Sequence, residues 1–302
     1  MKQLIVLGVV GFLAQLVDGS LGMAYGVTSS TLLLAAGVAP AAASAAVHFS
    51  EIGTSLVSGF SHHRLGNVDW RTVAILAGPG FVGAFVGATF LVSLPAETAK
   101  PWVAGILLAL GLYVIYRFLV LRGRRPQFRG RPSARFLAPM GLFGGALDAI
   151  GGGGWGPVGT TTLLSSGRLE PRKVVGSIDT SEFVVAVGGS LGFLVGLGAA
   201  GIDWGYALAL LAGGVVAAPI AAYLVKILPA RVLGVAAGGL IVLTNSTTIG
   251  GTLGLVGTQV GALAAVVGAL WIAGIVWAVR DEVALRRAEA AAREPSGELQ
   301  TA

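Results

Sequence analysis

The stretch DGSLGMAYGVTSST at residues 18–31 returns in altered form as DAIGGGGWGPVGTT at residues 148–161. Asp18 aligns with Asp148, and Tyr25-Gly26 aligns with Trp155-Gly156, at a constant offset of 130 residues. After one inserted residue, the match continues through Pro40 and Pro171, Ser50-Glu51 and Ser181-Glu182, Asp69-Trp70 and Asp203-Trp204, and Pro95-Ala96 and Pro229-Ala230. So many matches in the same order predict two homologous halves.

The composition places the chain in a membrane. Hydrophobic residues make up 55% of its 302 residues and charged residues only 11%, whereas soluble domains carry about 25% charged residues. The 48 glycines are typical of closely packed transmembrane helices. The net charge of +6 comes from basic clusters between apolar runs, without the interleaved aromatic residues of a nucleic-acid surface. We therefore expect a lipid bilayer as partner and no nucleic acid.

Several charge-free runs are long enough to span the bilayer, which takes about 20 helical residues. They are 72–96, 183–202, 204–225 and 232–279, with 39–60 and 101–116 as further candidates. Basic residues gather in alternate connections, around 64–71, 122–135, 168–173, 226–231 and 280–293. The positive-inside rule then predicts a multi-pass protein of the cell inner membrane, with its N-terminus outside and its C-terminus cytoplasmic.

Loop charges predict that the two halves are inverted. The connection 37–43 has no basic residue, whereas its counterpart 167–173 has three. The same connection therefore lies outside in one half and inside in the other, as in many secondary transporters. We expect an all-α polytopic membrane protein with two inverted-topology repeats. Its parts are a first repeat at 1–120, a cytoplasmic Arg-rich loop at 121–135, a second repeat at 136–250, an extra C-terminal helix at 251–280 and a cytoplasmic tail at 281–302.

Each half opens with two short apolar arms separated by a glycine-rich break. The arms are 4–17 and 21–36 in the first half, and 136–150 and 155–166 in the second. A helix of about 14 residues rises only about 21 Å, so these arms are expected to be broken or re-entrant. Interrupted segments at matching places of two repeats indicate a transporter binding site, because unpaired N–H groups at half-helix N-termini can receive an anion.

Hydroxyl-bearing and aromatic residues follow each break and are predicted to line a small polar cavity. The predicted substrate-binding residues are Gly22, Tyr25, Thr28, Ser29, Ser30, Gly154, Trp155, Thr160, Thr161, Thr162 and Asn245. Since the arms contain almost no basic residue, an anion would be held by backbone N–H groups and hydroxyls. The alternative is that each Ser or Thr bonds its own helix backbone or joins neighbouring helices.

Ionisable residues inside a span are costly to bury and are candidates for function. The predicted coupling or gating residues form two repeat-related sets, which are His48, Ser50 and Glu51, and Asp179, Ser181 and Glu182. A structural tie to unpaired backbone is the alternative for both. Because only the set with His48 can change between +1 and −1 with pH, replacing Glu51 is expected to alter pH dependence more than replacing Glu182.

Other polar residues receive structural roles. Asp18 and Asp148 are interpreted as helix caps or hinges at the breaks. His62 and His63 lie in a basic stretch and are expected to be solvated, since a metal site would need further ligands. No Lys-Ser/Thr follows the glycines at 151–154, there is no cysteine, and no catalytic motif is present. We therefore expect no enzyme, no metal and no cofactor.

The opening GFLAQLVDGSLG at 11–22 with GVTSS at 26–30, repeated as GLFGGALD at 141–148 with GGGGWGP and TTT, resembles the sulfite exporter (TauE/SafE) family. The resemblance covers residues 4–280. It implies a secondary transporter of sulfur-containing anions, such as sulfite, sulfoacetate, isethionate or taurine, either ion-coupled, proton-coupled or passive. An anion channel, or a transporter of another small organic anion, is the alternative. A homodimer is a further expectation.

Overall fold

The computed structural model describes residues 2–119, 131–166, 168–224 and 230–293, and these residues form helices without any strand. In chain order the helices are α1 (Lys2–Leu21), α2 (Tyr25–Ala35), α3 (Pro40–Arg64), α4 (Trp70–Ser93), α5 (Ala96–Leu119), α6 (Ala134–Gly151), α7 (Trp155–Ser166), α8 (Pro171–Leu197), the short 3-10 helix η1 (Ala199–Gly201), α9 (Trp204–Leu224), α10 (Ala230–Thr252) and α11 (Thr258–Arg293). The predicted all-α fold is confirmed. Most of the predicted Arg-rich loop lies outside the described residues.

Five helices of the described part are long and apolar enough to cross a membrane. These are Trp70–Ser93, Ala96–Leu119, Arg172–Leu197, Trp204–Ala221 and Thr258–Arg287. α3 and α10 have 25 and 23 residues, which is also enough length to cross about 30 Å of hydrocarbon. The chain is a multi-pass membrane protein.

Each repeat packs its first helix against the other repeat. α1 lies along α9, and α6 lies along α4. Glycines permit this close approach, because a Cβ on Gly11 would lie 2.3 Å from the carbonyl oxygen of Leu210, and one on Gly141 would lie 2.8 Å from that of Leu76. Gly11 and Gly141 occupy matching positions in the two repeats. The predicted repeat is therefore visible in the packing as well as in the sequence.

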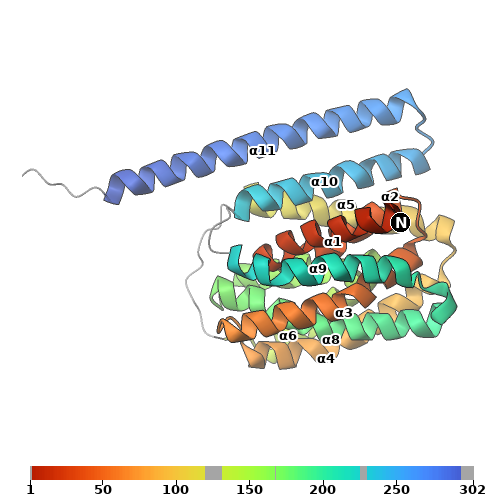
Figure 1. Cartoon of the computed structure of the whole chain (residues 1–302), viewed down its shortest axis with the longest axis horizontal. Helices are drawn as coiled ribbons and strands as arrows, with labels where there is room; N and C mark the ends of the chain where they lie inside the picture. Colours follow the sequence, from red (N-terminus) through yellow and green to blue (C-terminus); the bar gives the residue numbers. More distant parts are fainter. Residues whose placement is uncertain (1, 120–130, 167, 225–229, 294–302) are drawn as a thin grey trace, which may run out of the picture.

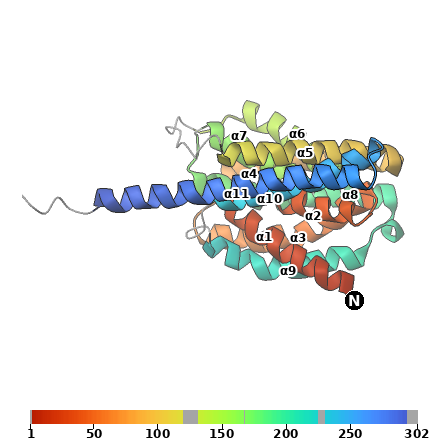
Figure 2. The same cartoon turned by 90° about the horizontal axis from the view of Figure 1, so that it is seen from above.

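The two repeats run in opposite directions. In Figure 1 the N-terminus lies at the right-hand end, whereas α5 ends and α6 begins at the left-hand end. In Figure 2, α2 lies toward the end that holds the N-terminus and α7 toward the opposite end. Each short helix thus runs back toward the end at which its preceding helix began. The two arms of each half therefore fold back on each other.

The first arm of each pair is longer than the sequence predicts. α1 has 20 residues and α6 has 18, so they are about 30 and 27 Å long. Asp18 and Asp148, together with the three residues after each of them, are still helical. The breaks are therefore confined to residues 22–24 and 152–154. Gly250 and Gly251 likewise stay within α10, so the connection to α11 is 253–257.

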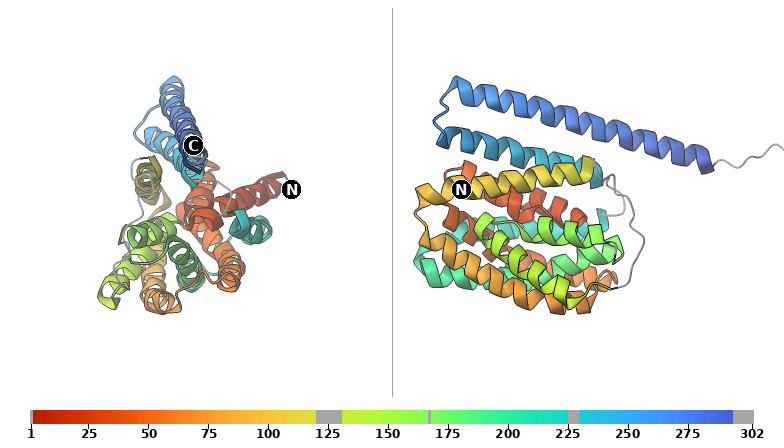
Figure 3. Two further views of the ribbon diagram at one scale, coloured as in Figure 1. Left: turned by 90° about the vertical axis from the view of Figure 1, so that its left-hand side faces the viewer. Right: turned by 180° about the vertical axis from the view of Figure 1, so that it is seen from behind.

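α11 lies at the edge of the bundle and packs mainly on α10, as Figure 3 shows. It has 36 residues and extends well past the other helices. Arg231 at the start of α10 forms an ion pair with Asp281 of α11, and its guanidinium lies 4.8 Å from the ring centre of Trp277. These contacts hold the two helices together.

The predicted topology can be tested by cysteine labelling, because the chain has no cysteine of its own. Leu65 lies in the connection before α4, and Thr98 lies in the first turn of α5, so Leu65→Cys and Thr98→Cys flank α4 at its opposite ends. With a membrane-impermeant maleimide, we expect intact cells to label Thr98→Cys and to label Leu65→Cys only after permeabilisation. Labelling of both positions from the same side would contradict the topology.

Candidate functional site

The two breaks meet backbone to backbone between the repeats. Gly22 and Gly152 end α1 and α6 in the left-handed region, with φ of 67° and 69°. A Cβ on Gly26 would lie 2.6 Å from the Gly152 carbonyl oxygen, and one on Gly156 would lie 2.6 Å from the Met23 Cα. Only glycine allows this crossing, which brings the N-termini of α2 and α7 together.

Asp18 and Asp148 cap the short helices that follow their own breaks. The Tyr25 N–H donates to Asp18 Oδ1 at 3.2 Å, and the Trp155 N–H donates to Asp148 Oδ1 at 3.0 Å. A carboxylate is favourable at a helix N-terminus because it meets unpaired N–H groups and the positive end of the helix dipole. The predicted capping role is confirmed at both positions.

A pair of hydroxyls ties each break to the opposite short helix. Ser30 Oγ donates to the Gly152 carbonyl at 2.7 Å, and Thr160 Oγ1 donates to the Gly22 carbonyl at 2.5 Å. Ser30 and Thr160 occupy matching positions, so these two hydrogen bonds are related by the repeat. Both hydroxyls therefore hold the crossing together.

Other predicted hydroxyls and amides are also engaged around the crossing. Thr161 Oγ1 donates to the Pro157 carbonyl of its own helix. Asn245 of α10 donates to Thr31 Oγ1 at 2.9 Å and so joins α10 to α2. Thr162 is half-buried on α7.

Thr28 and Ser29 differ from the other predicted hydroxyls. Both are buried on the first turns of α2, and neither Thr28 Oγ1 nor Ser29 Oγ has a hydrogen-bond partner among the described residues. Buried hydroxyls normally have partners, because an unpaired one costs about 1–3 kcal/mol. Among the predicted binding residues, Thr28 and Ser29 thus carry buried hydroxyls without a partner in the described structure.

Tyr25 and Trp155 are fully buried at the starts of α2 and α7. The Tyr25 hydroxyl lies 3.0 Å from Ser50 Oγ, and the Trp155 ring N–H donates to the Ile178 carbonyl at 3.1 Å. The rings pack on matching glycines, because a Cβ on Gly80 would lie 2.8 Å from the Trp155 ring and one on Gly214 would lie 3.3 Å from the Tyr25 ring. The predicted aromatic walls flank the crossing.

Two triads of ionisable side chains lie beside the crossing, and they are related by the repeat. The histidine triad consists of His48, Glu51 and Asp148, and the acidic triad of Asp179, Glu182 and Asp18. In each triad the nitrogen or oxygen atoms lie within 4.8 Å of one another, and all six residues are buried. Each triad combines α3 or α8 of one repeat with the aspartate of the other repeat's break, a pairing that the sequence did not indicate.

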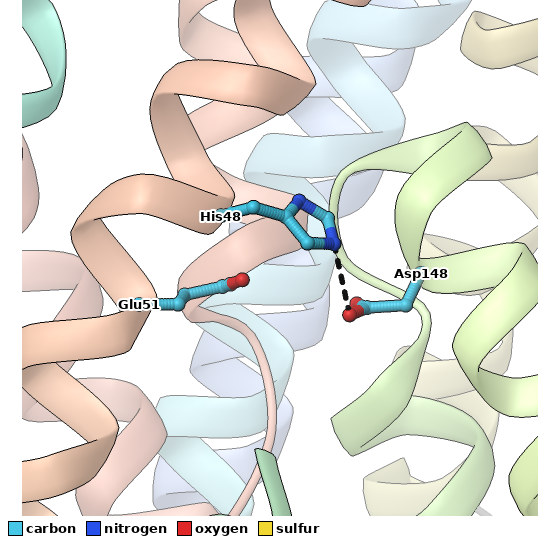
Figure 4. Close-up of side chains that lie close together, drawn as sticks. All are labelled: His48, Glu51 and Asp148. Carbon is cyan, nitrogen blue, oxygen red and sulfur yellow. Dashed lines mark ion pairs between the residues drawn. The ribbon is translucent and has the colours of Figure 1, made fainter. Parts of the chain in front are cut away.

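In the histidine triad an imidazole faces a carboxyl group. His48 Nδ1 lies 2.9 Å from the Ser44 carbonyl, to which it must donate, and His48 Nε2 lies 3.3 Å from Asp148 Oδ2 (Figure 4). Neither of these two facing atoms forms a hydrogen bond in the described structure, and a proton on either the imidazole or the carboxyl group would make their approach favourable. Glu51 points toward this pair from the next turn of α3, with both carboxyl oxygens lacking a hydrogen-bond partner in the described structure.

The acidic triad receives two hydroxyl donors from α3. Ser55 Oγ donates to Glu182 Oε2 at 3.2 Å, and Ser58 Oγ donates to Asp179 Oδ2. His62, one turn further along α3, places its Nε2 3.5 Å from the same Asp179 oxygen. The expectation that His62 is solvated is therefore wrong, since its exposed fraction is 2%.

This position of His62 also changes the expected difference between the triads. Replacing Glu51 was expected to alter pH dependence more than replacing Glu182, because no histidine was expected near Glu182. Because His62 lies beside Asp179, both triads have an imidazole within reach, and the expected inequality of Glu51 and Glu182 loses its basis.

One signal in the sequence could have identified Ser55, Ser58 and His62. They continue the series that starts at His48 and Glu51 with alternating steps of three and four residues. Such spacing keeps side chains on one face of a helix. We call this series the polar stripe of α3.

Comparison with known proteins identifies the family of this chain. The family model of the sulfite exporter TauE/SafE family matches residues 7–248. The chain belongs to this family. It is 51% identical over 250 residues to the probable membrane transporter protein YtnM of Bacillus subtilis (strain 168), covering 82% of this chain and 83% of the relative. It is 28% identical over 142 residues to the probable membrane transporter protein YdhB of the same organism, covering 47% of this chain and 58% of that relative.

No solved structure matches the chain. The family and the relatives' names agree with the helical fold, and the chain is a membrane transporter.

The backbone crossing predicts a strong effect of one added methyl group. A Cβ on Gly153 would lie 2.0 Å from the Val27 nitrogen, so Gly153→Ala should lower thermal stability in detergent by several degrees, corresponding to about 1–3 kcal/mol of overpacking. Gly268→Ala on α11 is the control, because its Cβ would meet nothing within 4 Å. Equal stability of the two variants would show that the breaks do not touch.

Proposed function

We propose that this transporter carries small sulfur-containing anions, such as sulfite, sulfoacetate, isethionate or taurine, across the cell inner membrane together with protons. The observation that supports the proposal most directly is that the N-termini of α2 and α7 cross between the two buried triads. A half-helix N-terminus attracts an anion, and a buried carboxyl that takes up a proton can supply the coupling.

The anion would bind at the first turn of α2. Thr28 and Ser29 offer unpaired hydroxyls there, and Tyr25 and Trp155 close the sides. Asp18 and Asp148 already accept the first N–H group of each short helix, from Tyr25 and Trp155. A sulfonate or sulfite must therefore share this region with two carboxyl groups, which it can do only when their charge is reduced.

Charge balance supports proton coupling. The two triads contain five carboxyl groups and one imidazole, and no Lys or Arg of the described residues forms an ion pair with them. Burying several unpaired carboxylates costs several kcal/mol each. An additional anion would raise this cost further, unless protons enter the cluster with it.

Uptake into proteoliposomes tests the proposal. The purified protein is reconstituted and offered sulfite, isethionate, taurine and sulfoacetate, with acetate and sulfate as comparison anions, with and without an imposed pH gradient. We expect at least one sulfur anion to accumulate faster when the outside is acidic. Equal uptake of all anions would contradict the substrate class, and currents far above transporter turnover would show a channel.

The hydroxyls of Thr28 and Ser29 should matter for substrate affinity. A hydrogen bond to a charged group contributes about 1.5–3 kcal/mol, so Thr28→Val or Ser29→Ala should weaken apparent affinity roughly 10- to 100-fold. Thr252→Ala is the control, because this exposed hydroxyl bonds only its own helix at the end of α10. Unchanged affinity in both test variants would place the anion elsewhere.

A further inference from the structure

The polar stripe of α3 connects the acidic triad to the end of the molecule that carries basic residues. Beyond Glu51 it places Ser55 against Glu182 and Ser58 against Asp179. It ends at His62, in the last turn of α3. The connection 65–69 then leads to α4. Each member lies one helical turn from the next, so the stripe leads from the crossing toward Arg64 and Arg71.

His62 is buried, and its imidazole points at the acidic triad. Its Nε2 has no hydrogen-bond partner in the described structure and lies 3.5 Å from Asp179 Oδ2. On the other side of the ring, Asn67 Nδ2 lies 3.4 Å from Nδ1, and the Asn67 N–H donates to the His62 carbonyl at 2.9 Å. The amide of Asn67 donates to Nδ1, which leaves the proton of a neutral ring on Nε2, facing the carboxyl group.

A crevice on the surface of the helix bundle approaches the carboxyl groups of the acidic triad. It has a volume of about 300 Å³ and lies between α3 and α8, with Trp70 at the start of α4 among its walls. Ser55, His63 and Thr180 are polar residues of its lining. Because the Ser55 hydroxyl donates to Glu182, the crevice ends one hydrogen bond away from the acidic triad.

We propose that His62 binds and passes the transported proton between the basic side of the protein and the acidic triad. This rests on the proposed proton-coupled function and names the residue that loads the cluster. When the Asn67 amide turns away from Nδ1, a proton that binds Nδ1 makes the ring an imidazolium, which gives the proton on Nε2 to the Asp179 carboxylate. The ring is then neutral, Asp179 is a neutral acid, and charge is conserved.

The charged groups around His62 are few. Asp179 faces it from α8, with Asp18 and Glu182 behind, and Asp69 lies in the connection that follows α3. His63 and Arg64 are its neighbours on α3, and Arg71 lies on α4. α9 also packs on α3 and has no Asp, Glu, His, Lys or Arg in its sequence. Asp179 is the carboxyl group within reach of the ring.

The test separates net transport from exchange in proteoliposomes. Isethionate is the probe, because a sulfonate stays ionised throughout the pH range used and carries no proton of its own. Net uptake is driven by an acidic exterior, with a trapped pH-sensitive dye recording proton entry. Exchange of labelled for unlabelled isethionate needs no net proton release. We expect His62→Gln to reduce net uptake and proton entry about 10-fold and to leave exchange within about twofold of wild type.

Two further variants make the result decisive. His63→Gln removes the neighbouring imidazole, which is exposed, contacts the Trp70 ring and lines the crevice. Because it is His62 whose ring lies beside Asp179, His63→Gln should leave both readouts unchanged. Asp179→Asn should reproduce the split seen for His62→Gln. Equal loss of net uptake and exchange in His62→Gln would show a structural role and overturn the proposal, as would unchanged net uptake.

If wild-type protein does not move isethionate, a pH jump without substrate still tests His62. Proton uptake by detergent-solubilised protein is then followed with an indicator dye. We expect uptake to be about 10-fold slower in His62→Gln than in wild type and His63→Gln. Equal rates would overturn the proposal independently of the substrate.

Discussion

The contact on which the rest of the structure depends is the crossing of the two breaks at Gly26 and Gly156. Backbone meets backbone there, so neither position tolerates a side chain. The crossing fixes the starts of α2 and α7, and with them the aspartates that cap these helices. It also sets the distance from each aspartate to the other repeat, which determines that Asp148 reaches His48 and that Asp18 reaches Asp179.

Because each triad draws on both repeats, its electrostatics depend on how the repeats sit relative to each other. Adding a proton to Asp148 removes both its attraction for an imidazolium and part of its strength as a helix cap. A movement of one repeat against the other would in turn change the distance between Asp148 and His48. Under the proposed proton coupling, these few atoms would link protonation to repeat movement.

The sequence predicted the repeat, its inversion, the breaks and the capping aspartates, because these depend on local order and loop charge. It could not predict the triads, since alignment pairs Asp18 with Asp148 but says nothing of which helix lies opposite each. His62 was misplaced because the basic residues near it suggested a loop, whereas α3 continues to Arg64. The first arms were predicted too short because glycine was taken as the end of a helix, whereas α1 and α6 continue helical through Gly19 and Gly151.

The scaffold follows the twofold repeat, whereas the unpaired hydroxyls and the histidines depart from it. Ser30 and Thr160 form matching hydrogen bonds, but the positions that match Thr28 and Ser29 are Val158 and Gly159, which have no hydroxyl. Unpaired donors therefore occur on α2 and lack equivalents on α7. The histidines differ in the same way, since His48 is covered by Phe193 at the crossing, whereas His62 lies at the end of the polar stripe. In the proposed mechanism, this one-sided chemistry on a twofold scaffold gives the anion and the proton separate places beside the same crossing.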